Sequence, residues 1–135
     1  MVTRTAMLEQ QLWDFVSIYD VAFDKASEAN GVSAAQACTL TPLMTNRHTM
    51  SELAEVLMCD ASNVTQLIDR LEARGLVSRT PDPADRRTRQ VTITPAGQRL
   101  RRAVGKEFTF PRERVGRLSD NEQDQLSQLL TKMLG

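Results

Sequence analysis

The sequence has few of the residues on which catalysis and metal binding depend. Its one histidine, His48, belongs to no histidine and cysteine cluster, so we expect a surface residue rather than a metal ligand. No pair of catalytic carboxylates, glycine-rich phosphate loop or nucleophile elbow is present. We therefore expect that the chain is not an enzyme and that it holds no metal or other cofactor.

The N-terminal stretch has no long hydrophobic run. Glu9, Asp14 and Asp20 interrupt it, which argues against a signal peptide or a membrane span and favours a cytoplasmic location. In a cytoplasmic chain the two cysteines, Cys38 and Cys59, are expected to be reduced thiols rather than a disulfide.

A net charge of zero, on 17 basic and 17 acidic residues, argues by itself against a nucleic acid partner. The distribution of the charge argues the other way. Residues 1–69 hold three basic and nine acidic residues, whereas residues 70–106 hold ten basic and three acidic ones. A basic stretch such as residues 70–106 is also compatible with an ordinary solvated surface. Its value as evidence for nucleic acid binding therefore depends on the structural motif that carries it.

The stretch from Asp60 to Glu72 reads as an amphipathic helix. Val64, Leu67, Ile68 and Leu71 recur at helical spacing and predict one buried stripe. The opposite face carries short or planar hydrogen-bonding groups of the kind that contact base edges and phosphates. These residues are Ser62, Asn63, Thr65, Gln66, Asp69 and Arg70.

A second short helix precedes this one and completes a helix-turn-helix. Thr49 and Glu52 form a capping-box pattern that opens it, and only Met58 to Asp60 separate the two helices. We expect Asp60 to cap the second helix. Left-handed backbone at Met58 would cost of order 1 kcal/mol.

A hairpin with a polar tip follows the helix-turn-helix. Gly75 is expected to end the helix in a left-handed conformation, and Val77 and Arg79 alternate against Val91 and Ile93 across two strands. The tip between them reads DPADRRTR, which is rich in arginine. Helix-turn-helix and basic hairpin together predict a winged helix.

The motifs of this region resemble those of the MarR family of bacterial transcription regulators. LAEVL (53–57), LIDRLEARGLVSR (67–79), DPADRR (82–87) and ITPAG (93–97) are similar to successive blocks of that family. The resemblance is close over residues 33–104, whereas the flanking helices agree only in position and amphipathic character. It implies a mainly α, winged helix-turn-helix fold with about six helices and a small β-hairpin wing.

The resemblance also implies a function. MarR-type proteins are homodimers that bind pseudo-palindromic double-stranded DNA, commonly as repressors, and a small aromatic or phenolic effector between the two lobes commonly releases them. An aspartate at the wing tip orients an arginine for the minor groove, while the recognition helix reads the major groove. The implied DNA-binding residues are Ser62, Asn63, Thr65, Gln66, Arg70, Arg74, Asp85, Arg86, Arg87 and Arg89. The candidate effector-binding residues are Trp13, Phe23, Met44 and Phe108, each of which is also an ordinary core residue type.

The flanking segments are predicted to form a dimerisation lobe from about residues 5–30 and 95–135, around a DNA-binding lobe of about residues 33–94. A first helix should run from about Thr5 to Ala29, and a second should begin after Ser33 and kink or end near Leu40 or Thr41, before Pro42. Pro111 should break the helix that Thr94 and Pro95 begin. Ser119 should cap a last helix with one apolar stripe, formed by Leu126, Leu129, Leu130, Met133 and Leu134.

Two other hypotheses fit the same residues. A thiol-based redox regulator would use Cys59 or Cys38 as its sensor, although a small buried hydrophobe is the simpler interpretation of Cys59. A winged helix is also compatible with a protein-interaction module that binds no DNA.

Overall fold

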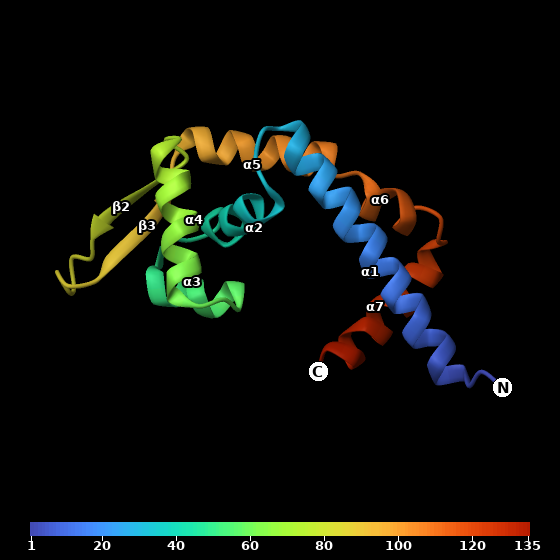
Figure 1. The fold of residues 1–135 in the computed structure, drawn as a ribbon. Coiled ribbons are helices and arrows are strands. Elements are labelled where there is room, and N and C mark those ends of the chain that lie inside the picture. Colours follow the sequence, from blue (N-terminus) through green and yellow to red (C-terminus); the bar gives the residue numbers. More distant parts are fainter. The chain divides into compact units, whose positions relative to one another are not determined.

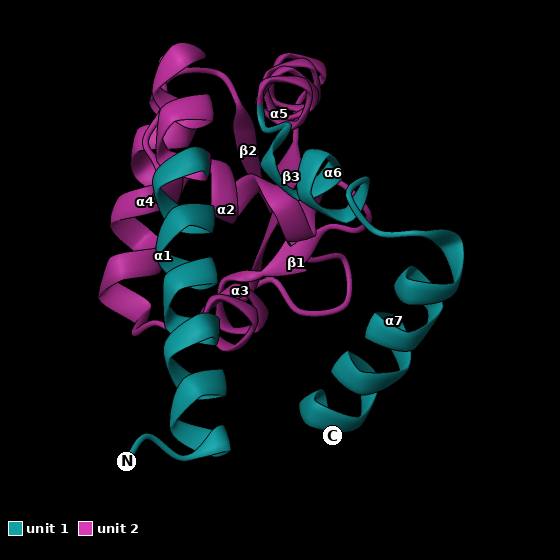
Figure 2. Ribbon diagram, turned by 90° about the vertical axis from the view of Figure 1, so that its right-hand side faces the viewer, with its two compact units in different colours: residues 1–22, 108–135 teal, residues 23–107 magenta.

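The computed structural model describes residues 1–135 and divides them into two compact units (Figure 2). Unit 1 comprises residues 1–22 and 108–135, and unit 2 comprises residues 23–107. None of the helices combines the length and the apolar character that crossing a bilayer requires. The elements in chain order are α1 (Arg4–Ala29), α2 (Ala34–Leu43), β1 (His48–Thr49), α3 (Met50–Leu57), α4 (Ala61–Ala73), β2 (Val77–Pro81), β3 (Arg89–Ile93), α5 (Pro95–Glu107), α6 (Phe110–Val115) and α7 (Asp120–Leu134) (Figure 1).

Unit 2 is a winged helix, as the sequence predicts. Its antiparallel sheet has the order β1-β3-β2, and the register pairs Val77 with Ile93 and Arg79 with Val91. The alternation expected across the hairpin is therefore confirmed. The helices α2, α3, α4 and α5 and the strands bury one apolar core between them. Its largest fully buried apolar members are Leu40, Leu53, Val64, Ile68, Leu71, Val77, Val91 and Val104.

Helix α2 corrects one prediction. Ser33 caps it together with Gln36 as expected, but the helix continues through Pro42 to Leu43 instead of ending at Leu40 or Thr41. Pro42 lies in the last turn, where its missing N–H removes one hydrogen bond only. The extra turn buries Leu43, which is 3% exposed, and this burial offsets the lost bond. Met44, one of the candidate effector-binding residues, is half-buried.

The sheet has a third strand that the sequence does not signal. Strand β1 contains only His48 and Thr49, which pair with Val91 and Gln90 of β3. His48 is thus a half-buried edge residue, and its Nδ1 lies 2.8 Å from the Asn46 carbonyl oxygen. Two residues are too few to show the alternation by which a strand is recognised.

Unit 1 is held by aromatic contacts. Tyr19 of α1 meets Phe108 edge-to-face with ring centroids 5.0 Å apart, and Phe15 lies 5.3 Å from Phe110. The break expected at Pro111 is confirmed, because α5 ends at Glu107 and Pro111 lies in the first turn of the short helix α6. The chain therefore has seven helices where about six were predicted.

Helices α1 and α7 keep apolar side chains on the surface of unit 1. Helix α7 begins with the predicted capping box of Ser119 and Glu122, yet it has no buried residue. All five residues of its apolar stripe are exposed, from 37% for Leu126 to 86% for Leu134. On α1, Leu8, Leu12 and Trp13 are also exposed.

Candidate DNA interface

Helix α4 owes its place to the turn that joins it to α3. Thr49 caps α3 by accepting a hydrogen bond from the Glu52 N–H at 3.1 Å. Met58 then adopts φ 52° and ψ 40°, the left-handed conformation whose cost was considered above, and reverses the chain. Asp60 caps α4 by accepting from the Asn63 N–H at 2.8 Å and from the Ser62 hydroxyl at 2.8 Å. These bonds hold the pKa of Asp60 below its ordinary value, the Asn63 amide contributing most.

The two faces of α4 separate as predicted. Val64, Ile68 and Leu71 are fully buried, while Leu67 is only half-buried. The expected polar residues Ser62, Asn63, Thr65, Gln66, Asp69 and Arg70 are all exposed. The Thr65 hydroxyl donates to the Ala61 carbonyl at 2.9 Å, whereas the side-chain amides of Asn63 and Gln66 make no hydrogen bond within the protein. These two amides are available to an external partner.

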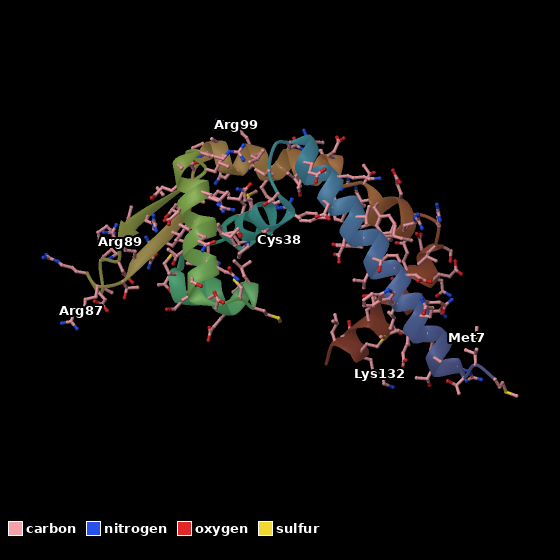
Figure 3. All side chains as sticks on the ribbon, in the orientation of Figure 1. Met7, Cys38, Arg87, Arg89, Arg99 and Lys132 are labelled. Carbon is pink, nitrogen blue, oxygen red and sulfur yellow. The ribbon has the colours of Figure 1, made fainter.

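The wing carries its arginines on a turn that is braced by backbone contacts. The Asp82 N–H donates to the Thr88 carbonyl at 2.8 Å and closes the loop between β2 and β3. Asp85 accepts from the Arg87 N–H at 3.0 Å inside that loop. Arg86, Arg87 and Arg89 are exposed, and Figure 3 shows Arg87 at the tip of the hairpin with its side chain extending outward.

Residues of α4, the wing and the start of α3 line a basic pocket of about 390 Å³. Hydroxyl and guanidinium groups line it, as a phosphate site requires. Its residues are Met50 and Ser51 of α3, Thr65 of α4, Arg79 of β2, Thr88, and the exposed Arg87 and Arg89. Thr65 of the polar face of α4 and Arg87 of the wing tip thus line the same pocket.

Comparison with known proteins identifies relatives of this chain. Residues 44–88, which include α3, α4 and most of the wing, match the model of the MarR family. The transcriptional regulator HosA of Escherichia coli O111:H- is 37% identical over 83 residues, which cover 61% of this chain and 62% of HosA. The transcriptional activatory protein BadR of Rhodopseudomonas palustris is 33% identical over 116 residues, which cover 82% of this chain and 66% of BadR. The chain belongs to the MarR family.

The similarity to these curated relatives spans less than two thirds of their length. Solved structures of MarR family proteins agree over more of the fold. The apo form of MarR from E. coli has a TM-score of 0.80 at 26% identity, covering 95% of this chain and 97% of that one. A cysteine-to-serine mutant of the same protein, complexed with operator DNA, has a TM-score of 0.75 at 27% identity, covering 95% and 94%.

This MarR family chain has a second pocket on the other side of α4. It measures about 400 Å³ and includes both cysteines of the sequence, the exposed Cys38 on α2 and the half-buried Cys59 after α3. The side chains of Asn63, Gln66 and Arg70 line the same pocket. Leu67 also lines it, which explains why this residue of the apolar stripe is only half-buried.

The structure gives several of the anticipated site residues a partner within the protein. Arg74 donates from Nη1 to the Gly31 carbonyl at 2.8 Å, so its guanidinium braces the end of α1. Among the candidate effector residues, Phe23 receives the Arg101 guanidinium 5.8 Å from its ring centroid, and Phe108 packs on Tyr19. Trp13 and Phe108 belong to unit 1, whereas Phe23 and Met44 belong to unit 2.

The expected DNA-binding residues do not include four that line the basic pocket, which are Met50, Ser51, Arg79 and Thr88. Ser51 stands at the start of α3, and Arg79 was read only as one of the alternating residues of a strand. The arginine could have been found from its acidic neighbours, because Asp69 and Glu72 are spaced three residues apart and so share one face of α4.

Proposed function

We propose that the chain is a cytoplasmic transcription regulator that binds double-stranded DNA through unit 2. One observation carries the proposal: Thr65 on the exposed polar face of α4 lines one basic pocket together with the exposed wing arginines Arg87 and Arg89. A recognition helix in the major groove with an arginine-tipped wing in the adjacent minor groove fits that arrangement. The E. coli MarR mutant complexed with operator DNA, similar over almost the whole chain, supports DNA as the partner.

In this mode α4 reads bases and the wing holds the backbone. Asn63 and Gln66 offer side-chain amides that suit adenine edges in the major groove, while Ser62, Thr65 and Arg70 supply further donors. The wing contributes Arg86, Arg87 and Arg89, and Asp85 shapes the turn that presents them. Arg74 would contribute only through the donors that its bond to Gly31 leaves unused.

The proposed active form is a homodimer assembled through unit 1. The exposed apolar residues of α1 and α7 form the kind of surface that marks a protein interface. Two recognition helices related by a two-fold axis would enter successive major grooves about 34 Å apart, so the operator would be a pseudo-palindrome. Repression is the proposed outcome of binding, with release by a small aromatic or phenolic effector. The candidate effector-binding residues stay Trp13 and Phe108 of unit 1 and Phe23 and Met44 of unit 2.

The dimer is tested by placing a charge in the apolar stripe of α7. Leu129→Glu and Leu130→Glu should convert a dimer to a monomer at micromolar concentration, measured by sedimentation velocity. Gln128→Glu adds the same charge on the opposite face of α7 and should leave the dimer intact. A wild-type chain that sediments as a monomer would remove the dimer from the proposal.

DNA binding is tested by footprinting the purified chain on the promoter nearest its gene, at several salt concentrations and with a panel of phenolic compounds. Gln66→Ala should lose about 1–3 kcal/mol of binding free energy at particular bases only. Absence of salt-dependent binding would favour the protein-interaction module. Increased transcription on binding would make the chain an activator, the role that the name of BadR states for that relative.

A thiol-based version of the same regulator is favoured by the second pocket. Cys38 and Cys59 line it beside Asn63, Gln66 and Arg70, so oxidation there would alter the surroundings of the proposed base-reading residues. Peroxide should then weaken DNA binding by the wild type, and at least one of the variants Cys38→Ser and Cys59→Ser, the one that lacks the sensing thiol, should not respond. Equal binding before and after oxidation in all three proteins would dismiss it.

A further inference from the structure

Arg79 ties the recognition helix to the base of the wing. Its Nη2 lies 2.7 Å from Asp69 Oδ1 and 2.9 Å from Glu72 Oε1, two carboxylate oxygens of α4. Its backbone N–H also donates to Glu72 Oε2 at 3.0 Å. One residue of β2 therefore holds α4 through both its main chain and its side chain.

The guanidinium of Arg79 differs from the other arginines of the wing in its surroundings. Its side chain is 22% exposed, whereas Arg86, Arg87 and Arg89 are exposed and form no ion pair that would neutralise them. Two carboxylates compensate its single charge, and the bond to Glu72 contributes most to keeping the Arg79 pKa raised. Arg79 therefore has little unpaired charge to offer a phosphate, although it lines the basic pocket.

The two acids that pair with Arg79, Asp69 and Glu72, lie on the helix proposed to read DNA. Asp69 lies on the exposed face of α4 that also carries the proposed base-reading residues, and half of its side chain is exposed. A carboxylate beside DNA repels the phosphates and weakens binding. A carboxylate at this position is therefore expected to have another role that offsets the repulsion. Fixing the spacing between helix and wing is such a role, because both elements must enter adjacent grooves at once.

We infer that Arg79 is a positioning residue for DNA recognition, which sets the register between α4 and the wing through Asp69 and Glu72. This inference rests on the proposed function. It assigns the residue no phosphate contact, and it gives Asp69 and Glu72 a part in DNA specificity that their charge would otherwise oppose.

The test compares operator DNA with random DNA of the same length, across a range of salt concentrations. Arg79→Gln should weaken operator binding at least about tenfold and reduce the operator-to-random ratio, while the slope of log affinity against log salt stays near that of the wild type. A phosphate-binding arginine would instead lower the slope by about one and weaken both DNAs alike. That second pattern would overturn the inference.

Substitution of Asp69 and Glu72 separates a positioning role of these acids from simple charge repulsion, because only a positioning role predicts a lower operator-to-random ratio. Asp69→Asn with Glu72→Gln removes two negative charges and releases Arg79, so binding to random DNA should rise while the operator-to-random ratio falls about tenfold. If the acids are only unfavourable charges, operator and random affinity will rise together and the ratio will not change. An unchanged ratio in this variant overturns the inference.

Matched controls separate positioning from general damage. At exposed positions of unit 2, Arg99→Gln on α5 makes the same charge change as Arg79→Gln, and Glu28→Gln on α1 makes the same change as Asp69→Asn alone. Both controls should leave the ratio unchanged. If Arg79→Gln fails to fold by circular dichroism, Asp69→Asn alone leaves both Glu72 contacts in place, and it must still lower the ratio. If the wild type shows no salt-dependent binding to any DNA, the proposed function fails. If the wild type binds DNA but the variants keep the wild-type operator-to-random ratio, only the positioning role of Arg79 fails.

Discussion

The carboxylate of Asp85 accepts a hydrogen bond from the backbone N–H of Arg87 at 3.0 Å, and this contact shapes the tip of the wing. The same carboxylate accepts from the Thr88 hydroxyl at 3.2 Å, and the Asp85 carbonyl accepts from the Thr88 N–H at 3.0 Å. Asp85 thus acts on the main chain that carries the arginine. The Arg87 side chain stays exposed, so its guanidinium is available to an external anion.

Arg87→Ala should therefore weaken operator binding and lower the salt slope by about one unit, because one phosphate-neutralising charge is lost. Fluorescence anisotropy at a series of potassium chloride concentrations measures both quantities. Arg117→Ala removes an exposed arginine of unit 1 and serves as the control. Unchanged affinity and slope for Arg87→Ala would show that the wing tip does not contact DNA.

Asp60 should make the stability of unit 2 depend on pH in the acid range. The backbone N–H of Asn63 and then the Ser62 hydroxyl lower its pKa below the ordinary value of 3.8. A pKa that is lower in the folded than in the unfolded chain contributes stability above 3.8, and this contribution is lost as pH falls through the folded pKa. Asparagine caps a helix equally well without titrating.

The measurement compares melting temperatures of the wild type and Asp60→Asn from neutral pH downward. The difference in melting temperature between the two proteins should stay constant near neutral pH. Below pH 3.8 the melting temperature of the wild type should fall relative to that of Asp60→Asn. Asp60→Ala, which removes the cap, should be less stable at every pH. A difference between wild type and Asp60→Asn that does not vary with pH would contradict the assignment of the cap.

The parts of the fold that sequence predicts well are those set by local chemistry. The caps at Ser33, Thr49, Asp60 and Ser119 form as expected, and each side chain accepts a hydrogen bond from the backbone N–H three residues later. A cap is predictable because it depends on one turn of chain only. The stripe of α4 was readable because burial repeats with the helical period.

The parts that sequence could not predict depend on distant partners. Strand β1 exists because residues of β3 more than forty positions away supply its hydrogen bonds. Asp69 was grouped with DNA-reading residues, since a helix face does not reveal that Arg79 of the next strand engages it. Pro42 stayed in α2 because the burial of Leu43, a tertiary effect, outweighed a local rule.

Met58→Gly should stabilise the chain. Met58 is the one residue other than glycine with positive φ, at 52°, and its side chain is 93% exposed, so removing that side chain sacrifices little packing. Glycine adopts this conformation without the steric cost, so we expect a gain of up to about 1 kcal/mol in the free energy of unfolding. Urea denaturation measures it. Met58→Ala retains Cβ and should show no gain, and equal stability of the two variants would contradict strain at this turn.

Gly97 should tolerate no side chain, for a reason that lies in packing rather than in backbone conformation. It sits in the first turn of α5, where a Cβ would come within 2.1 Å of the Leu76 carbonyl oxygen and 2.7 Å of Ile93 Cγ1. The Leu76 oxygen cannot yield easily, because it accepts from the Thr94 N–H at 3.0 Å and so joins the start of β2 to the end of β3.

Gly97→Ala should accordingly lower the free energy of unfolding by about 2–3 kcal/mol or more, since relief of the clash requires α5 to move away from the sheet. Gly105→Ala is the matched control in the same helix, where a Cβ meets only Arg101 Nη1 at 3.5 Å. There the better helix propensity of alanine should raise stability by up to about 1 kcal/mol. Chemical denaturation of both variants gives the comparison, and two changes of the same sign would mean that α5 does not pack on the Leu76 carbonyl as closely as described.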